Sequence, residues 1–155
     1  DLSRGLGDVY KRQVYIFFVF GNMFNMEFKS RFKVYYEDTD SGGVVYYDNY
    51  LKFLERARTD AITSLDFSNN KLVEKFGIFI IVKSCNLNFL RPAKLEDNLD
   101  IISKVIEVKN VSIKMKQNIF VNDSMIVEAE ILLASVNNEG KPSKLPDEFK
   151  NELIK

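Results

Sequence analysis

Residues 34–59 read VYYEDTDSGGVVYYDNYLKFLERART, and within this stretch the pattern changes from that of a strand to that of a helix. The two glycines that follow Asp40 and Ser41 can adopt positive φ angles, so they predict a turn. Beyond the turn, apolar residues recur at steps of three and four, which indicates one long amphipathic helix; they are Tyr50, Phe53, Leu54, Ala57, Ala61 and Leu65. The stretch therefore predicts a strand, a turn that carries aspartates, and a long helix.

The segments on either side of this stretch have simpler patterns. Residues 28–36 alternate as a strand does, and a short helical segment at 71–76 ends at Gly77. The period then changes to two, which predicts four consecutive strands before a short terminal helix; the strands cover residues 78–89, 99–108, 111–121 and 125–136, and the helix covers 147–154. One helix with about five strands predicts an α+β fold in two layers, with the long helix across an antiparallel sheet.

The segment at residues 78–89 is predicted to be a strand covered by the helix. Ile78, Ile80 and Val82 make its first half apolar on both faces, which is typical of a strand that lies under a helix. Cys85 falls on the apolar parity of this segment, so we expect it to be a small buried hydrophobic residue and not a nucleophile.

Composition excludes several classes of function. The 155 residues are 46% hydrophobic and 28% charged, as expected for one globular domain, and equal numbers of basic and acidic residues (22 each) give no reason to expect nucleic acid as a partner. The absence of histidine rules out Ser-His-Asp and Cys-His chemistry and histidine metal sites. A single cysteine permits no intrachain disulfide and indicates a reducing, cytoplasmic location. We expect no metal and no redox cofactor.

The first residues have neither a helical nor a strand period. We interpret residues 1–25 as a non-native or disordered N-terminal extension, because RGLGDVYKRQ resembles a translated sequencing adapter, and we take 26–155 as the domain. Met26 or Met23 would then be the true start. A signal peptide is the alternative, but the apolar run at 14–20 is short and no small-residue cleavage site follows it. The run is also far shorter than the ~20 residues that span a bilayer, so we expect no integral membrane segment.

Two interpretations of the aspartates in the turn are open from the residues alone. Asp38 and Asp40 could cap the helix or form the turn, as aspartates at such places often do. Alternatively, a carboxylate beside the unpaired N–H groups of a helix start could attack a carbonyl or activate water, while those N–H groups stabilise the developing oxyanion. For Asp38 the structural role is favoured.

The stretch at 34–59 also resembles the signature of the YbgC and 4-hydroxybenzoyl-CoA thioesterases, a family of hotdog-fold proteins. The resemblance continues through residues 77–93 (GIFIIVKSCNLNFLRPA), 95–99 (LEDNL) and 140–146 (GKPSKLP), so it covers essentially Met26 to the C-terminus. It implies the hotdog fold, in which a long central helix packs against an antiparallel sheet, and an acyl-CoA thioesterase activity. Short-chain acyl groups are favoured because YxDTD followed by ERART is closer to the YbgC branch.

The resemblance also implies roles for particular residues. Asp40 corresponds to the catalytic carboxylate, as nucleophile or general base, and the backbone N–H of Tyr47 corresponds to the donor that polarises the carbonyl. Many relatives carry histidine where this chain has Tyr47. Residues expected to bind substrate are Gly43, Val44, Tyr46, Tyr50, Arg58 and Lys83; among these, Tyr46 and Tyr50 are candidates for the core or the acyl-pocket wall, and Arg58 and Lys83 are candidates for CoA contacts or plain solvated charges.

Substrate and assembly follow from the same resemblance. The expected substrate is acyl-CoA, with an acyl-carrier-protein thioester as a second possibility. Similar proteins form homodimers by joining two sheets edge to edge, often pairing again into homotetramers, with the active site at the subunit boundary. A hotdog hydratase is disfavoured because its histidine is missing, whereas a non-catalytic module that binds acyl thioesters or a partner protein remains an alternative.

Overall fold

The computed structural model describes residues 26–155. What the sequence predicts for residues 1–25, whether extension or signal peptide, lies outside the described residues. The described elements, in chain order, are β1 (Glu27–Lys33), the short 3-10 turn η1 (Tyr36–Asp38), α2 (Asn49–Ser64), α3 (Asn69–Phe76), β2 (Phe79–Phe89), β3 (Asn98–Val108), β4 (Ser112–Val121), β5 (Ser124–Val136) and α4 (Asp147–Leu153).

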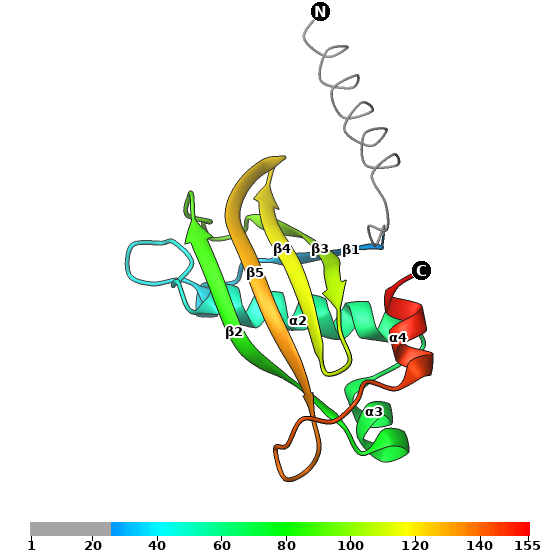
Figure 1. The fold of residues 1–155 in the computed structure, drawn as a ribbon. Helices are drawn as coiled ribbons and strands as arrows, with labels where there is room; N and C mark the ends of the chain where they lie inside the picture. The colour runs from blue at the N-terminus through cyan, green and yellow to red at the C-terminus, as the bar shows by residue number, and fades with distance from the viewer. Residues whose placement is uncertain (1–25) are drawn as a thin grey trace, which may run out of the picture.

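The five strands form one antiparallel sheet with the order β1-β3-β4-β5-β2. The long helix α2 runs across one face of the sheet, while α3 and α4 lie at its lower and right-hand margins in the view of Figure 1. Hairpins join β3 to β4 and β4 to β5, whereas β1 and β2 reach their places at the two edges through longer connections. The predicted α+β fold, with a central helix on a sheet of five strands, is confirmed.

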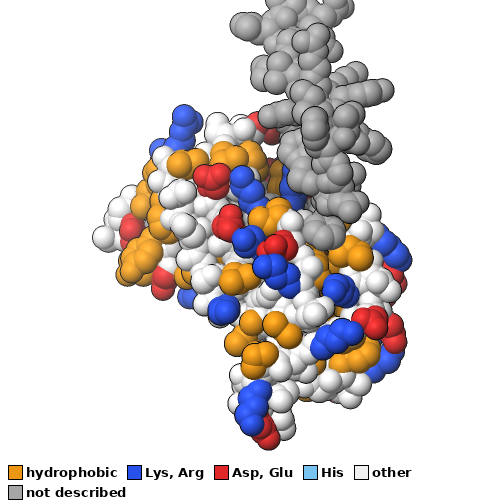
Figure 2. All heavy atoms as spheres, viewed as in Figure 1, with side chains coloured by type: hydrophobic (Ala, Val, Ile, Leu, Met, Phe, Trp, Pro, Cys, Tyr) orange, Lys and Arg blue, Asp and Glu red, His pale blue; other side chains and the backbone are white. Residues whose placement is uncertain are grey.

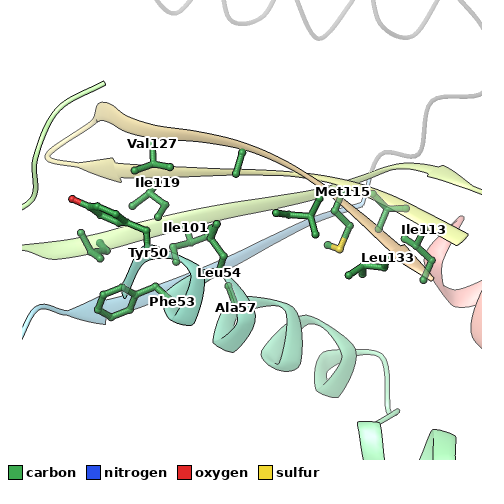
Figure 3. Packing of buried hydrophobic residues seen from close by; sticks show 14 of the residues in the cluster. Tyr50, Phe53, Leu54, Ala57, Ile101, Ile113, Met115, Ile119, Val127 and Leu133 are labelled. Carbon is green, nitrogen blue, oxygen red and sulfur yellow. The ribbon is translucent and has the colours of Figure 1, made fainter. Parts of the chain in front are cut away.

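The hydrophobic core lies between α2 and the inner face of the sheet. The apolar stripe of the helix is buried as its spacing predicts, with Phe53, Leu54 and Ala57 at most 1% exposed. These side chains pack against alternate residues of the strands, such as Ile101 and Ile119, in one contiguous cluster (Figure 3). This packing fixes α2 against the sheet and therefore fixes the position of its N-terminal end.

The first strand is shorter than the sequence predicts. It ends at Lys33 and not near residue 36, because the chain turns into η1. The buried side chain of Asp38 accepts a hydrogen bond from the backbone N–H of Tyr35 (2.9 Å), which holds this turn. The structural role that we expect for Asp38 is thus confirmed.

Two expectations for β2 are wrong. The sequence predicts a strand under the helix, but α2 packs most closely on β1 and β3, and β2 lies at the far edge of the sheet. Cys85 is consequently exposed and not buried. A strand with apolar residues on both faces looks the same in sequence whether a helix covers it or not, so the pattern alone could not reveal this position.

The outer face of the sheet, opposite to α2, is charged. Lys116 pairs with Glu128 (3.4 Å) and Lys104 with Glu27 (3.2 Å) across neighbouring strands. Figure 2 shows basic and acidic side chains interspersed over this face. Within residues 26–155, no helix is both long enough and apolar enough to cross a membrane.

Candidate active site

The loop between η1 and α2 folds into a tight turn that presents Asp40. Thr39 and Val45 pair as an antiparallel bridge, and inside this bridge the N–H of Asp40 donates to the carbonyl of Val44 (2.9 Å). The turn closes when the N–H of Gly43 donates to the carbonyl of Asp40 (3.0 Å). Gly43 has a φ of 75°, which favours glycine, as the sequence predicts.

The carboxylate of Asp40 is exposed, and only one of its two oxygens accepts a hydrogen bond. Its Oδ1 accepts a hydrogen bond from the N–H of Gly42 (2.8 Å). Its Oδ2 has no hydrogen-bond partner among residues 26–155. One oxygen therefore orients the side chain, while the other is available to a reacting group.

Gly42 matters for this orientation because a side chain there would press on the carboxylate. A Cβ atom added at Gly42 would lie 3.1 Å from Asp40 Oδ1, closer than an ordinary van der Waals contact. We expect Gly42→Ala to reduce kcat roughly tenfold, since small displacements of a reacting group are costly, while the melting temperature changes little. Steady-state kinetics and thermal unfolding check this, with Ser41→Ala in the same turn as the control. Wild-type kcat in Gly42→Ala would show that the placement of Asp40 tolerates this contact.

The chain enters α2 with an unpaired backbone donor. The helix begins at Asn49, after the N-cap residue Asp48, whose side chain makes no capping hydrogen bond. Among the described residues, the N–H of Tyr47 has no acceptor, whereas the neighbouring N–H of Tyr46 donates to the carbonyl of Asp38 (3.0 Å). A free N–H at the positive end of a helix is suited to stabilise an oxyanion.

Exposed aromatic side chains surround this donor. The rings of Tyr46 and Tyr47 lie 4.9 Å apart, and Tyr47 meets Phe89 of β2 edge-on at 6.4 Å. The neighbouring Tyr47 phenol raises the pKa of Tyr46, with smaller contributions from burial and from the carboxylates of Asp48 and Asp40. In Figure 2, apolar side chains gather at the left-hand side of the molecule, where this loop lies. An apolar surface on the same loop as the carboxylate could accommodate an acyl group.

The structure brings together some of the predicted site residues and separates others. Asp40, Gly43, Val44, Tyr46 and Tyr47 belong to a single loop, as predicted. Tyr50 instead lies inside the core at 3% exposure, at one end of the cluster (Figure 3), so it is not part of an open wall.

The two basic residues that were expected to contact CoA lie away from this loop. Arg58 is ten residues beyond the helix N-cap, about 15 Å along α2. It is not a solvated charge: it donates to Oε1 of the buried Gln117 (2.9 Å), and burial lowers the pKa of its guanidinium. Lys83 is exposed on β2, at an irregularity in the pairing with β5.

Sequence reasoning missed Asn49 and Ala93, which support the loop. Asn49 follows an aspartate at a helix start, where it is easily taken for a capping residue. Ala93 lies far from this loop in the sequence, and its carbonyl accepts from the N–H of Val45 (2.9 Å). No local sequence pattern predicts a contact between residues so far apart in the sequence. Within residues 26–155, no group of three or more cysteine and acidic side chains could hold a metal ion.

The loop that leads into the central helix of this α+β two-layer fold thus carries an exposed carboxylate and an unpaired backbone N–H. Groups of these two kinds can support acyl transfer without histidine. Residues 34–153 match the Thioesterase-like superfamily, and the chain belongs to this family. The sequence-based assignment to the hotdog thioesterases of the YbgC type, and with it the expectation of a thioester hydrolase, is therefore confirmed.

Relatives of known name are similar over most of their length. The chain is 40% identical to the acyl-CoA thioesterase YbgC of Haemophilus influenzae over 119 residues, which cover 76% of this chain and 88% of the relative. It is 37% identical to the acyl-CoA thioesterase YbgC of Helicobacter pylori over 134 residues, which cover 79% and 97%. The crystal structure of a probable thioesterase from Bartonella henselae superposes with a TM-score of 0.75 at 34% identity, covering 78% of this chain and all of that one.

Proposed function

We propose that the chain hydrolyses acyl-CoA thioesters to a free acid and CoA, with short-chain acyl groups preferred. The observation that carries this proposal is that one loop bears both groups: the Asp40 carboxylate, with one oxygen available, and the Tyr47 N–H, which has no acceptor among the described residues. The names of the relatives, acyl-CoA thioesterases of the YbgC type, support the substrate class.

The chemistry follows from these two groups. The Tyr47 N–H donates to the thioester oxygen and stabilises the negative charge that develops on it. As general base, Asp40 takes a proton from water, which attacks the carbonyl carbon; the tetrahedral intermediate then expels the CoA thiolate, which is protonated to the thiol. As nucleophile, Asp40 attacks the carbon itself, expels the thiolate and forms a mixed anhydride, which water hydrolyses. Both routes consume one water and yield the acid and the thiol.

We further propose that two copies of the chain join through the free edge of β2. The other edge strand, β1, carries Lys29, Arg31 and Lys33, and such charges discourage edge-to-edge pairing. In contrast, β2 is eleven residues long, has Lys83 as its one charged residue, and exposes apolar side chains on both faces, including Ile81 (44%) and Val82 (48%). A partner strand would cover these side chains and pair the free backbone groups. Further pairing into a tetramer is compatible with this arrangement.

The activity can be tested with the full chain by following thiol release from acetyl-CoA through palmitoyl-CoA and from benzoyl-CoA. We expect the highest kcat/KM among the short acyl chains. A preference for palmitoyl- or benzoyl-CoA would contradict only the short-chain preference. If the folded protein binds CoA esters but turns none over, it is a binding module and the enzymatic proposal is wrong.

A further inference from the structure

The loop that carries Asp40 is closed at its neck by Asn49, the first residue of α2. The side-chain amide of Asn49 is buried and donates from Nδ2 to the backbone carbonyl of Asp38 (2.9 Å). The same carbonyl accepts the N–H of Tyr46 (3.0 Å), and the backbone N–H of Asn49 donates to the carbonyl of Tyr46 (2.9 Å). Asn49 thus ties both ends of the turn to the start of the helix.

This arrangement is not that of a helix cap. A capping side chain accepts hydrogen bonds from N–H groups of the first turn, whereas the Asn49 amide donates to a carbonyl outside the helix. The bond therefore satisfies a carbonyl of the loop and provides no acceptor for the unpaired N–H groups of α2. What it does set is the separation between two segments, the one that leads into Asp40 and the one that carries the Tyr47 N–H.

The second residue of the helix supports the loop from the other side. The hydroxyl of the buried Tyr50 accepts the backbone N–H of Ala93 (3.0 Å), and the carbonyl of Ala93 in turn accepts the N–H of Val45 (2.9 Å). Val44 and Lys94 form a bridge beside this contact. Consecutive residues of one rigid helix therefore hold the loop through two separate hydrogen-bonded routes.

We propose that Asn49 is a positioning residue for hydrolysis: its hydrogen bond to the Asp38 carbonyl sets the distance between the Asp40 carboxylate and the Tyr47 N–H, and Tyr50 assists through Ala93. The inference rests on the proposed function. Because an error of about 1 Å in the placement of reacting groups can cost roughly 10²-fold in rate, a side chain that touches no substrate can still control kcat.

Asn49→Asp in the full chain tests this, because the change is isosteric but removes the donor. At neutral pH the new carboxylate would face the Asp38 carbonyl oxygen and repel it. We expect kcat to fall roughly 10- to 100-fold with little change in KM. Protonation restores an O–H donor, so the ratio of variant to wild-type kcat should rise as the pH falls. The ratio at each pH removes the pH dependence that the variant and the wild type share.

Asn137→Asp is the matched control. The Oδ1 atom of Asn137 accepts the N–H groups of Glu139 and Lys141 in a distant turn, a role that a carboxylate can also fill. Its kcat and pH profile should equal those of the wild type. If Asn49→Asp does not fold, Tyr50→Phe supplies the second test, since it removes only the acceptor for the Ala93 N–H. We expect it to lower kcat severalfold at unchanged KM.

Several outcomes would overturn the inference. These are an Asn49→Asp kcat within twofold of the wild type, a loss that does not recover at low pH, or, where only Tyr50→Phe folds, an unchanged kcat. The proposed function fails separately, when the folded wild-type chain releases no thiol from any CoA ester. An inactive Asp40→Asn together with a fully active Asn49→Asp would contradict only the positioning role.

Discussion

Asp40→Asn should lower the kcat for short-chain acyl-CoA hydrolysis by roughly 10²- to 10⁴-fold, the range expected when a general acid or base is removed. The amide is isosteric, and its oxygen can still accept the N–H of Gly42, so the turn should keep its shape. What is lost is the negative charge on the free oxygen, which either attacks the carbonyl or takes a proton from water. Thiol release under single-turnover and steady-state conditions measures the effect.

A neighbouring carboxylate provides the control for Asp40→Asn. Asp48 is also exposed and lies just before α2, but its side chain makes no capping hydrogen bond. Because there is no capping hydrogen bond to lose, Asp48→Asn should keep most of the activity and the melting temperature. If Asp40→Asn retained more than about a tenth of the wild-type kcat, Asp40 would not be the general base or nucleophile. Equal losses in both variants would indicate a general electrostatic effect of the loop.

Ile81→Lys on β2 is expected to convert a dimer to a monomer and to remove most of the hydrolytic activity with it. A lysine on an edge strand places a desolvated charge in any edge-to-edge interface, which is how natural proteins prevent such pairing. Light scattering should give about twice the chain mass of 18.0 kDa for the wild type and a single chain mass for the variant. Activity should fall because, in the proposed assembly, the loop of one copy faces strands of the other.

Ile106→Lys is the matched control for this substitution. Ile106 is exposed to nearly the same degree (41% against 44% for Ile81), but it lies on β3, an interior strand of the sheet, at the irregularity in the pairing with β4. This variant should remain a dimer with wild-type activity. A wild-type chain that is monomeric at micromolar concentration and fully active would refute the proposed dimer, and a dimeric Ile81→Lys would place the interface elsewhere.

Local patterns predicted most of the elements because each depends on residues close in sequence. The steps of three and four between Tyr50 and Leu65 predict α2, and the glycine-containing turn before it places Asp40 in the loop that leads into this helix. The alternation in β4 and β5 predicts a hairpin, which the register confirms from Ser112↔Ala134 to Val121↔Ser124. Side-chain periods and turn residues are short-range features, and here tertiary packing reinforced them.

Long-range relations were not predictable in the same way. Arg58 has the sequence context of a solvated helix charge, yet it bonds to Gln117 on a strand 59 residues away. Asn49 resembles a capping residue, yet its amide holds a loop carbonyl 11 residues earlier. Both contacts depend on how α2 lies against the sheet and on how the chain returns to it, which no local pattern encodes.

The sequence by itself determined most of the secondary structure, the fold class, the loop of Asp40 and the absence of histidine chemistry. It did so because hydrophobic period, glycine positions and residue chemistry are properties of short segments. Only the tertiary structure decided that β2 is an edge strand, that Cys85 is exposed, and that Asn49 and Tyr50 hold the loop of Asp40. The physical reason is that strand order and buried polar contacts depend on which distant segments meet. The local sequence of one segment does not specify which segments will pack against it.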